Sequence, residues 1–256
     1  MLEQVDLDQT VTKAQYQKRL PALQRRLYEL EHAVFTANIP VMVVFEGWAA
    51  TGKGSLVNVL AERLDPRGFR VVPISPPRTA ETRYPWMWRF WLKVPARGQI
   101  VVYDQSWYRR VLIDRLTKVV RQRDLENVFQ DINDFEEMLA ADGVLFLKFW
   151  FHISRKEQRR RFKKLLADPL TAWQVSEEDA RQHKQYAKYA GAVEEMLART
   201  DSPHAPWVIV PATDRYYARL AVCETLIRTL EAGLGDKAPP PAPAGRRARA
   251  EEAADA

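Results

Sequence analysis

Short apolar runs alternate with longer amphipathic segments along most of this chain. Five runs are candidate strands: 41–45 (VMVVF), 70–74 (RVVPI), 99–103 (QIVVY), 144–151 and 207–210 (WVIV). A short apolar run without alternation is typical of a strand that is buried on both faces of a parallel sheet. The intervening segments show the three- and four-residue spacing of helices. We therefore predict an α/β domain with a parallel five-stranded sheet and helices on both faces.

The two ends of the chain differ from this alternating pattern. Before the first strand, large apolar residues recur three or four positions apart, at Leu20, Leu23, Leu27, Leu30 and Val34. This spacing predicts an amphipathic helix in an N-terminal extension, residues 1–38. We expect its apolar face to pack on the domain of residues 39–233 rather than on a second subunit. Residues 234–256 are rich in proline and lack large apolar side chains from 238 on, so we expect a disordered tail.

Composition narrows the class of protein. The chain has 256 residues and is 46% hydrophobic, which excludes a wholly disordered chain. Cys223 is the only cysteine, which excludes a disulfide scaffold. No apolar run approaches the ~20 residues that span a bilayer, and the N-terminus lacks an apolar signal core, so we expect a soluble cytoplasmic protein. The net charge of +6 is modest, but cations crowd residues 155–164, which makes a polyanion a candidate partner.

The strongest chemical signal follows the first predicted strand. In VMVVFEGWAATGKGS, Gly47 and Gly52 have the G-x-x-x-x-G-K spacing with Lys53, between a strand and a helix. The glycines allow the backbone amides to converge on one point, the helix N-terminus adds positive potential, and the lysine contacts phosphate oxygens. Gly54 stands where a serine or threonine would ligate Mg²⁺, so the metal must rely on other oxygen ligands. We predict a phosphate-binding loop.

An acidic residue ends the strand at 99–103. Ligands bind at the carboxyl ends of strands in an open parallel sheet, so Asp104 is the expected magnesium carboxylate beside the phosphate loop. Asp104 could instead cap a helix that starts near Trp107, which is the structural alternative. With a phosphate loop present, we favour the metal role.

Several longer blocks resemble one known family. They are FEGWAATGKG, DPRGFRV, YPWMWRFW, YDQSWYRRVL, the basic segment and DPLTAWQVSEEDARQHKQY. In this order they resemble the polyphosphate kinase 2 family over roughly residues 5–231, and look closest to its polyphosphate:AMP phosphotransferase branch. The resemblance implies a P-loop kinase fold, a three-layer sandwich like thymidylate kinase with a helical lid at about residues 153–175. It also implies Mg²⁺-assisted phosphoryl transfer between inorganic polyphosphate and a nucleoside mono- or diphosphate, AMP or ADP above all.

The resemblance also implies roles for particular residues. It assigns phosphate binding to Gly47, Gly52, Lys53 and Gly54, the magnesium carboxylate to Asp104, and charge neutralisation to Arg89 and Arg110. The lid cations that would follow polyphosphate are Arg155, Lys156, Arg159, Arg160 and Lys163. The alternative for this segment is an exposed, solvated basic helix. We expect a homo-oligomer with no membrane and no nucleic acid as partner.

Two residues depart from the family pattern. Ala49 stands where the family loop has an aspartate, and Gln105 stands where it has an arginine. The loop is thus degenerate, which leaves a second hypothesis: a catalytically impaired module that binds nucleotide or polyphosphate and regulates an active partner. A third hypothesis, an ATP-using small-molecule kinase, shares the loop but does not explain the other blocks. Intact Lys53, Asp104 and Arg110 favour the active polyphosphate-dependent kinase.

Overall fold

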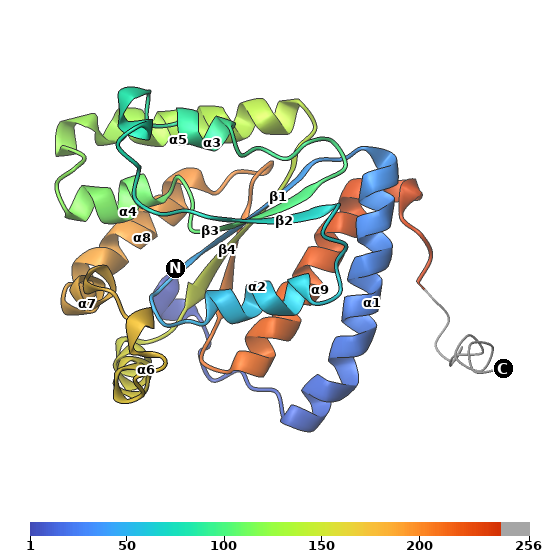
Figure 1. Ribbon diagram of the computed structural model, residues 1–256, viewed down its shortest axis with the longest axis horizontal. Helices are drawn as coiled ribbons and strands as arrows, with labels where there is room; N and C mark the ends of the chain where they lie inside the picture. The colour runs from blue at the N-terminus through green and yellow to red at the C-terminus, as the bar shows by residue number, and fades with distance from the viewer. Residues whose placement is uncertain (242–256) are drawn as a thin grey trace.

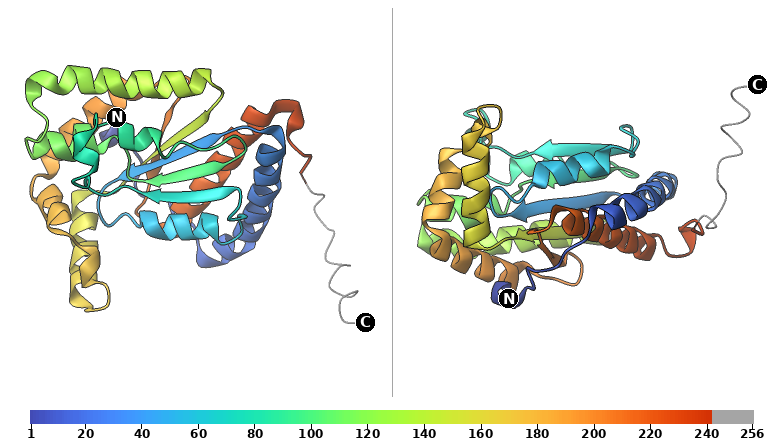
Figure 2. Two further views of the ribbon diagram at one scale, coloured as in Figure 1. Left: turned by 45° about the horizontal axis from the view of Figure 1, so that its top comes forward. Right: turned by 90° about the horizontal axis from the view of Figure 1, so that it is seen from below.

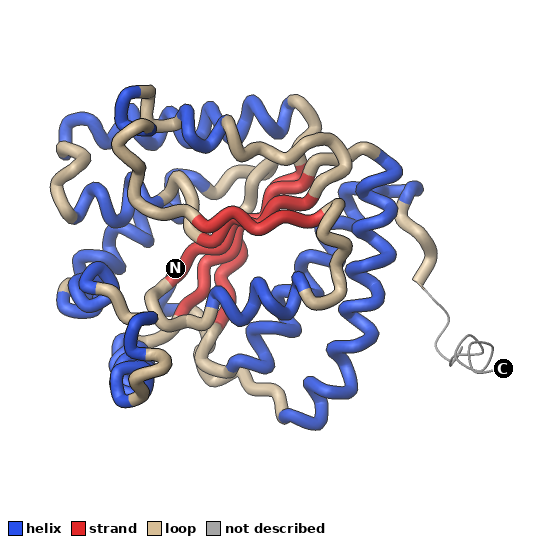
Figure 3. The backbone as a smooth tube through the Cα atoms, in the orientation of Figure 1, coloured by secondary structure: helices blue, strands red, loops and turns tan. Residues whose placement is uncertain are grey.

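A five-stranded parallel sheet forms the centre of the molecule (Figure 3). The structure, a computed structural model, describes residues 1–241. The strands are β1 (Val41–Gly47), β2 (Phe69–Pro73), β3 (Ile100–Asp104), β4 (Leu145–His152) and β5 (Trp207–Pro211), in the order β2-β3-β1-β4-β5. β1 lies at the centre, with Val43 paired to Val102 on one side and Leu147 on the other. The predicted α/β architecture with five parallel strands is confirmed.

Helices cover both faces of the sheet, which gives three layers (Figure 1). One face carries α1 (Lys13–Ala37), α2 (Lys53–Ala61) and α9 (Arg215–Leu234), and the other carries α3 (Trp88–Trp91), α4 (Arg109–Leu116), α5 (Leu125–Ala141) and α8 (Tyr186–Thr200). Two further helices, α6 (Arg155–Ala167) and α7 (Glu177–Lys184), project at the end of the sheet where β4 ends (Figures 1 and 2). α6 falls within the segment predicted as a lid, about residues 153–175, whereas α7 follows it; the two are called the lid helices below.

The N-terminal helix packs on the body of the molecule. α1 begins with a capping box in which Thr12 and Gln15 exchange hydrogen bonds, and it runs alongside α9 (Figures 1 and 2). Leu27, Leu30 and Val34 of α1 are buried in the core. The apolar face of the helix is therefore covered by its own chain, as expected from its spacing.

The segment after α9 is partly ordered. Gly235–Lys237 form a short 3-10 helix where the sequence predicted disorder, and Arg26 of α1 donates to the carbonyl oxygen of Pro240 (3.5 Å). The rest of the predicted tail, from 242 on, lies outside the described residues. Among residues 1–241, no helix is both long enough and apolar enough to span a membrane.

Candidate functional site

The phosphate loop, residues 47–53, connects the end of β1 to the start of α2. Gly47 has no room for a side chain, because a Cβ there would lie 2.6 Å from the carbonyl oxygen of Phe151. Gly52 precedes the helix with φ 91°, in the left-handed region that favours glycine. Both glycines are thus required by local geometry, and the predicted strand–loop–helix context of the motif is present.

Lys53 opens α2 and lies over the loop. Its ammonium donates to the carbonyl oxygens of Gly47 (3.3 Å) and Trp48 (3.2 Å). Thr51 holds the turn closed, because its hydroxyl donates to the Trp48 carbonyl oxygen (2.8 Å). A lysine resting on carbonyl oxygens at a helix N-terminus can transfer its hydrogen bonds to phosphate oxygens without crossing the core.

Two cavities meet at Lys53. The larger, of about 700 Å³, is lined by the phosphate loop, Asp104, and Arg161 and Lys164 of α6. The smaller, of about 330 Å³, lies between α4, α7 and α8 and has an apolar wall. Its walls include Glu46, Ile113, Leu116, Glu178, Gln182 and Tyr189. Lys53, Ala49, Gln105 and Asp179 line both cavities. Two ligands can therefore approach the same lysine from different sides.

Asp104 lies half-buried at the end of β3 and faces the larger cavity. Within residues 1–241 its carboxylate takes part in no hydrogen bond or ion pair. The next helix, α4, has Tyr108 as its N-cap, which excludes the capping role for Asp104. A half-buried carboxylate that none of the described residues engages, beside a phosphate loop, suits a divalent cation. Mg²⁺ typically takes one or two carboxylates and completes its shell with phosphate oxygens and water.

Glu46 is a second acid at the site, near the end of β1 and directly before the loop. It is buried on the wall of the smaller cavity, and Ser106 donates to its Oε1 (2.7 Å). Burial raises the pKa of Glu46 to about 7, although Ser106 and the Lys53 charge act in the opposite direction. The sequence placed Glu46 near the loop, but burial and the contact with Ser106 follow only from the pairing of β1 with β3.

Comparison with known proteins identifies the family. The family profile described as Polyphosphate kinase 2 matches residues 10–237. The chain belongs to the polyphosphate kinase 2 family. A crystal structure of polyphosphate kinase 2 from Arthrobacter aurescens TC1 superposes with a TM-score of 0.87 at 30% identity, covering 100% of this chain and 92% of that one. One from Pseudomonas aeruginosa PA01 gives the same TM-score at 37% identity, covering 91% and 50%.

Curated relatives in the polyphosphate kinase 2 family carry phosphotransferase names. A polyphosphate:AMP phosphotransferase of Pseudomonas aeruginosa is 37% identical over 91% of this chain and 47% of its own length. An ADP-polyphosphate phosphotransferase of the same organism is 36% identical over 89% of this chain and 75% of its own length. The chain thus spans about half the length of the first of these relatives.

Two arginines assigned by the polyphosphate kinase 2 resemblance lie outside both cavities. Arg110 pairs with Asp114 (Nη1–Oδ2, 3.3 Å) and lies over the ring of Trp86. Arg89 pairs with Glu81 (Nη2–Oε2, 3.5 Å) and is mostly buried. The structure therefore brings Lys53 and Asp104 together but does not place these two guanidinium groups with them.

The lid helix α6 turns a different face to the site than the sequence suggested. The five predicted lid cations are exposed, and none lines either cavity; they are Arg155, Lys156, Arg159, Arg160 and Lys163. Gln158 and Phe162 are buried, so α6 packs with the face that also carries Arg161. Arg161 and Lys164 are the lid cations that reach the larger cavity. Phe162 was the signal for this orientation, because an apolar residue in a basic helix marks its inner face.

Side chains of the lid bind the backbone of the phosphate loop. Arg161 donates from Nη1 to the carbonyl oxygens of Ala50 (3.0 Å) and Thr51 (3.1 Å). Gln182 of α7 accepts a hydrogen bond from the Ala49 amide (2.8 Å). Gln158 donates to Gln182 (2.9 Å), so the two lid helices contact the loop as one unit. Gln158 also donates to the Ala49 carbonyl oxygen (3.3 Å), so the lid holds one amide and three carbonyl oxygens of the loop.

A bidentate ion pair connects the lid to the body of the domain. Arg109 at the start of α4 donates to both carboxylate oxygens of Glu178 on α7, at 2.9 and 2.6 Å. Arg109 also lies 3.4 Å from Asp114. The pair stands beside the smaller cavity, which Glu178 lines. Sequence reasoning gave no role to Arg109, and only the packing of α7 against α4 reveals one.

Proposed function

We propose that this chain transfers a phosphoryl group between inorganic polyphosphate and a nucleoside mono- or diphosphate, with AMP or ADP as nucleotide. The main support for the proposal is that two chemically different cavities are both lined by Lys53. Phosphoryl transfer requires two phosphates in line, held by positive charge and shielded from water. The names of the polyphosphate kinase 2 relatives support this reaction and this pair of substrates.

The larger cavity is suited to the phosphate chain. It combines the loop amides with Lys53, Arg161 and Lys164, and it is the more open of the two. The smaller cavity is suited to the nucleotide, since Ile113 and Leu116 supply an apolar surface for a base. The acceptor and donor phosphates would then meet at Lys53, which lines both spaces.

Particular groups would neutralise charge during transfer. Lys53 and the loop amides hold the phosphates beside the transferred group, and Arg161 adds a guanidinium from the lid. Asp104 would hold Mg²⁺, which neutralises phosphate charge when bound. Arg89 and Arg110 would take part only after exchanging their ion pairs with Glu81 and Asp114 for phosphate.

The alternative of an impaired module depends on Ala49 and Gln105. Two features of the described residues favour turnover. Glu46 keeps a carboxylate at the wall that Ala49 shares, and Arg161 brings a guanidinium to the cavity that Gln105 lines. Other residues thus bring a carboxyl group and a guanidinium to the site, with burial leaving Glu46 partly ionised near pH 7. We therefore propose an active enzyme rather than a regulatory module.

The test is phosphorylation of AMP and ADP by the purified chain with Mg²⁺ and either polyphosphate or ATP as donor. We expect product with polyphosphate and none in Lys53→Ala, because the loop then lacks its fixed positive charge. Product with ATP alone would establish the ATP-using kinase. No product from the natural chain, together with product from Ala49→Asp, would establish the impaired module.

A further inference from the structure

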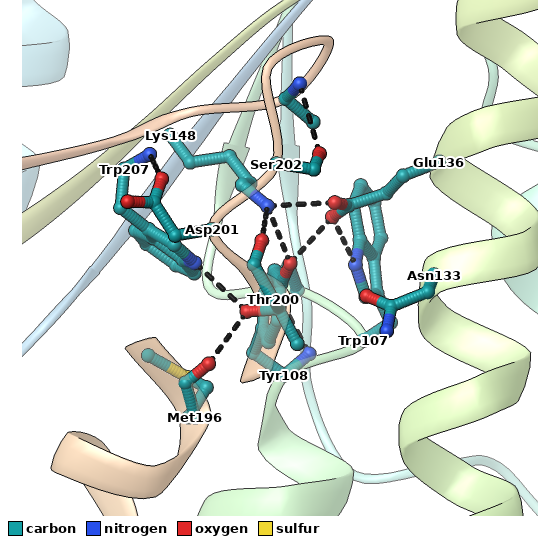
Figure 4. A network of polar contacts seen from close by, with 12 residues as sticks. Trp107, Tyr108, Asn133, Glu136, Lys148, Met196, Thr200, Asp201, Ser202 and Trp207 are labelled. Carbon is teal, nitrogen blue, oxygen red and sulfur yellow. Dashed lines mark hydrogen bonds and ion pairs between the residues drawn. The ribbon is translucent and has the colours of Figure 1, made fainter. Parts of the chain in front are cut away.

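A network of buried polar side chains includes Trp107 and Tyr108, which follow Asp104 in the sequence (Figure 4). At its centre is Lys148 of β4, whose ammonium donates to the Glu136 carboxylate (2.6 Å), the Tyr108 hydroxyl (2.8 Å) and the Thr200 carbonyl oxygen (2.7 Å). The side chains of Lys148 and Glu136 are 0% and 1% exposed. A buried ion pair adds little net stability compared with apolar residues of similar size, so stability alone does not explain this one.

Glu136 of α5 links the network to the loop. Its Oε1 accepts hydrogen bonds from the Trp107 indole (3.0 Å) and the Tyr108 hydroxyl (2.6 Å). Both aromatic side chains are completely buried. Figure 4 shows that Lys148 and Glu136 come from different elements and converge on these two loop residues. The second half of the loop is therefore fixed by β4 and α5.

The first half of the same loop faces the candidate site. Gln105 lines both cavities and has φ 62°, a left-handed conformation that is uncommon outside glycine. Ser106 donates to Glu46 (2.7 Å) and accepts from the Tyr108 amide (3.2 Å). A strained residue keeps its conformation only where its surroundings impose it. The Gln105 amide donates to the Phe45 carbonyl oxygen, and Ser106 is held by Glu46. The anchors at Trp107 and Tyr108 fix the backbone that follows.

We propose that Lys148 and Glu136 are positioning residues for phosphoryl transfer. They act through Trp107 and Tyr108, which fix the backbone of residues 105 and 106 and thereby the direction of the neighbouring Asp104 carboxylate. Lys148 and Glu136 line neither of the two cavities that meet at Lys53, so they would act without touching a substrate bound there. The turnover measurements below rest on the proposed function, whereas the hydrogen-exchange measurements do not.

The test compares two buried tyrosine hydroxyls. Tyr108→Phe removes the hydroxyl that joins Lys148 to Glu136, whereas Tyr103→Phe removes one that donates to the Lys93 carbonyl oxygen (2.7 Å), next to Asp104 but outside the network. Each variant loses one oxygen atom and keeps its ring, so both are expected to fold. Turnover and amide hydrogen exchange of residues 104–108 are measured for both.

We expect Tyr108→Phe to lower kcat about 10-fold, as loss of a supporting contact commonly does, with little change in KM for polyphosphate. Exchange of the Gln105 amide, which donates to the Phe45 carbonyl oxygen (3.0 Å), should become faster. Tyr103→Phe should change neither. Equal effects of the two variants, or faster exchange without loss of kcat, would overturn the proposal. If the natural chain proves inactive, the exchange comparison alone decides the positioning role, so the two proposals fail separately.

Glu136→Gln extends the same test to the ion pair. It keeps the shape of the side chain but removes the charge that faces Lys148, and we expect it to lower kcat at least as much as Tyr108→Phe does. Glu31→Gln is the matched control, because Glu31 is another buried carboxylate, on α1 and away from both cavities. A loss of kcat in both glutamine variants would show a general cost of destabilisation and contradict the proposal.

Discussion

The two sides of Lys53 are built by different means. On the sheet side, Glu46 and the loop after Asp104 are held by buried contacts, and Lys148 and Glu136 fix that loop from within the core. On the lid side, α6 reaches the phosphate loop mainly through Arg161 and Gln158, whose partners there are backbone carbonyl oxygens. Buried networks rigidify, whereas elements with few core contacts open at lower cost. We therefore expect the sheet side to be the fixed half of the site and the lid side to be its movable half.

The lid contacts explain how movement and binding can be coupled. Arg161 donates to four carbonyl oxygens, two in the phosphate loop and two after β5, at Ala212 and Thr213. A phosphate that enters the loop offers stronger, charge-assisted hydrogen bonds to the same guanidinium. The lid can therefore exchange protein partners for substrate without disturbing the core. On the sheet side, Lys148 and Glu136 line neither cavity, so bound substrate has no contact of theirs to replace.

The largest effect should come from the fixed half. Asp104→Asn is expected to lower kcat/KM by roughly 10² to 10³, since Mg²⁺ would lose its carboxylate ligand and with it much of the charge neutralisation at the phosphates. Asp168→Asn is the matched control, because Asp168 also lines the larger cavity but is engaged in a turn of the lid with the Leu170 amide (2.9 Å). Steady-state rates across a Mg²⁺ titration give both values. Equal losses would show that Asp104 has no special role.

Replacing lid arginines should give a smaller effect that depends on the face of α6. Arg161→Ala is expected to lower kcat/KM by about 10- to 100-fold, because the lid loses its contact with the loop and substrate is misplaced. Arg160→Ala is the control: Arg160 also pairs with Glu157 but is exposed and contacts no loop atom. An exposed pair contributes little, so its rate should stay within about twofold. A greater loss for Arg160 or Arg159 would favour the original prediction, in which the exposed cations of α6 bind polyphosphate.

The buried half of the site was the easier to predict. The apolar runs and the G-x-x-x-x-G-K spacing are local, and parallel pairing brings the strand ends together, which places Lys53 and Asp104 at one edge. Gly47 and Gly52 indicate backbone conformations that other residues rarely adopt. These signals depend on neighbours in sequence and on the general rules of parallel sheets.

The lid and the arginines were harder to predict because their orientation depends on distant packing. The cations of α6 do not by themselves show which face of the helix points inward. That face is determined by Gln158 and Phe162, which are buried against α7. Arg110 and Arg89 were placed by resemblance, but their ion-pair partners, Asp114 and Glu81, decide where they lie. Lys148 gave no signal beyond a charge inside an apolar strand, which in retrospect indicates a buried partner.

The smallest expected effect is on the pH dependence of the free energy of unfolding, which should differ between the two halves. The folded-state pKa of Glu46 is raised from 4.5 to about 7 by burial, so between these values the unfolded state has released a proton that the folded state keeps. Stability therefore falls as pH rises through this window, by up to about 1.4 kcal/mol per pH unit, and levels off above it. Glu46→Gln should remove this contribution from the pH dependence measured by urea unfolding, whereas the contributions of Glu31, whose pKa burial also raises to about 7, and of His152 remain.

The lid supplies the control of opposite sign. The pKa of Glu157 is lowered, first by its hydrogen bond with Arg160, so its contribution to stability is present above pH 4.5 and is lost as pH falls below it. Glu157→Gln should therefore leave the slope between pH 4.5 and 7 unchanged, and because Glu157 is partly exposed its effect at lower pH should be small. If Glu46→Gln and Glu157→Gln gave the same profile, the sheet side would be as open to solvent as the lid. The contrast between a fixed and a movable half would then be wrong for Glu46.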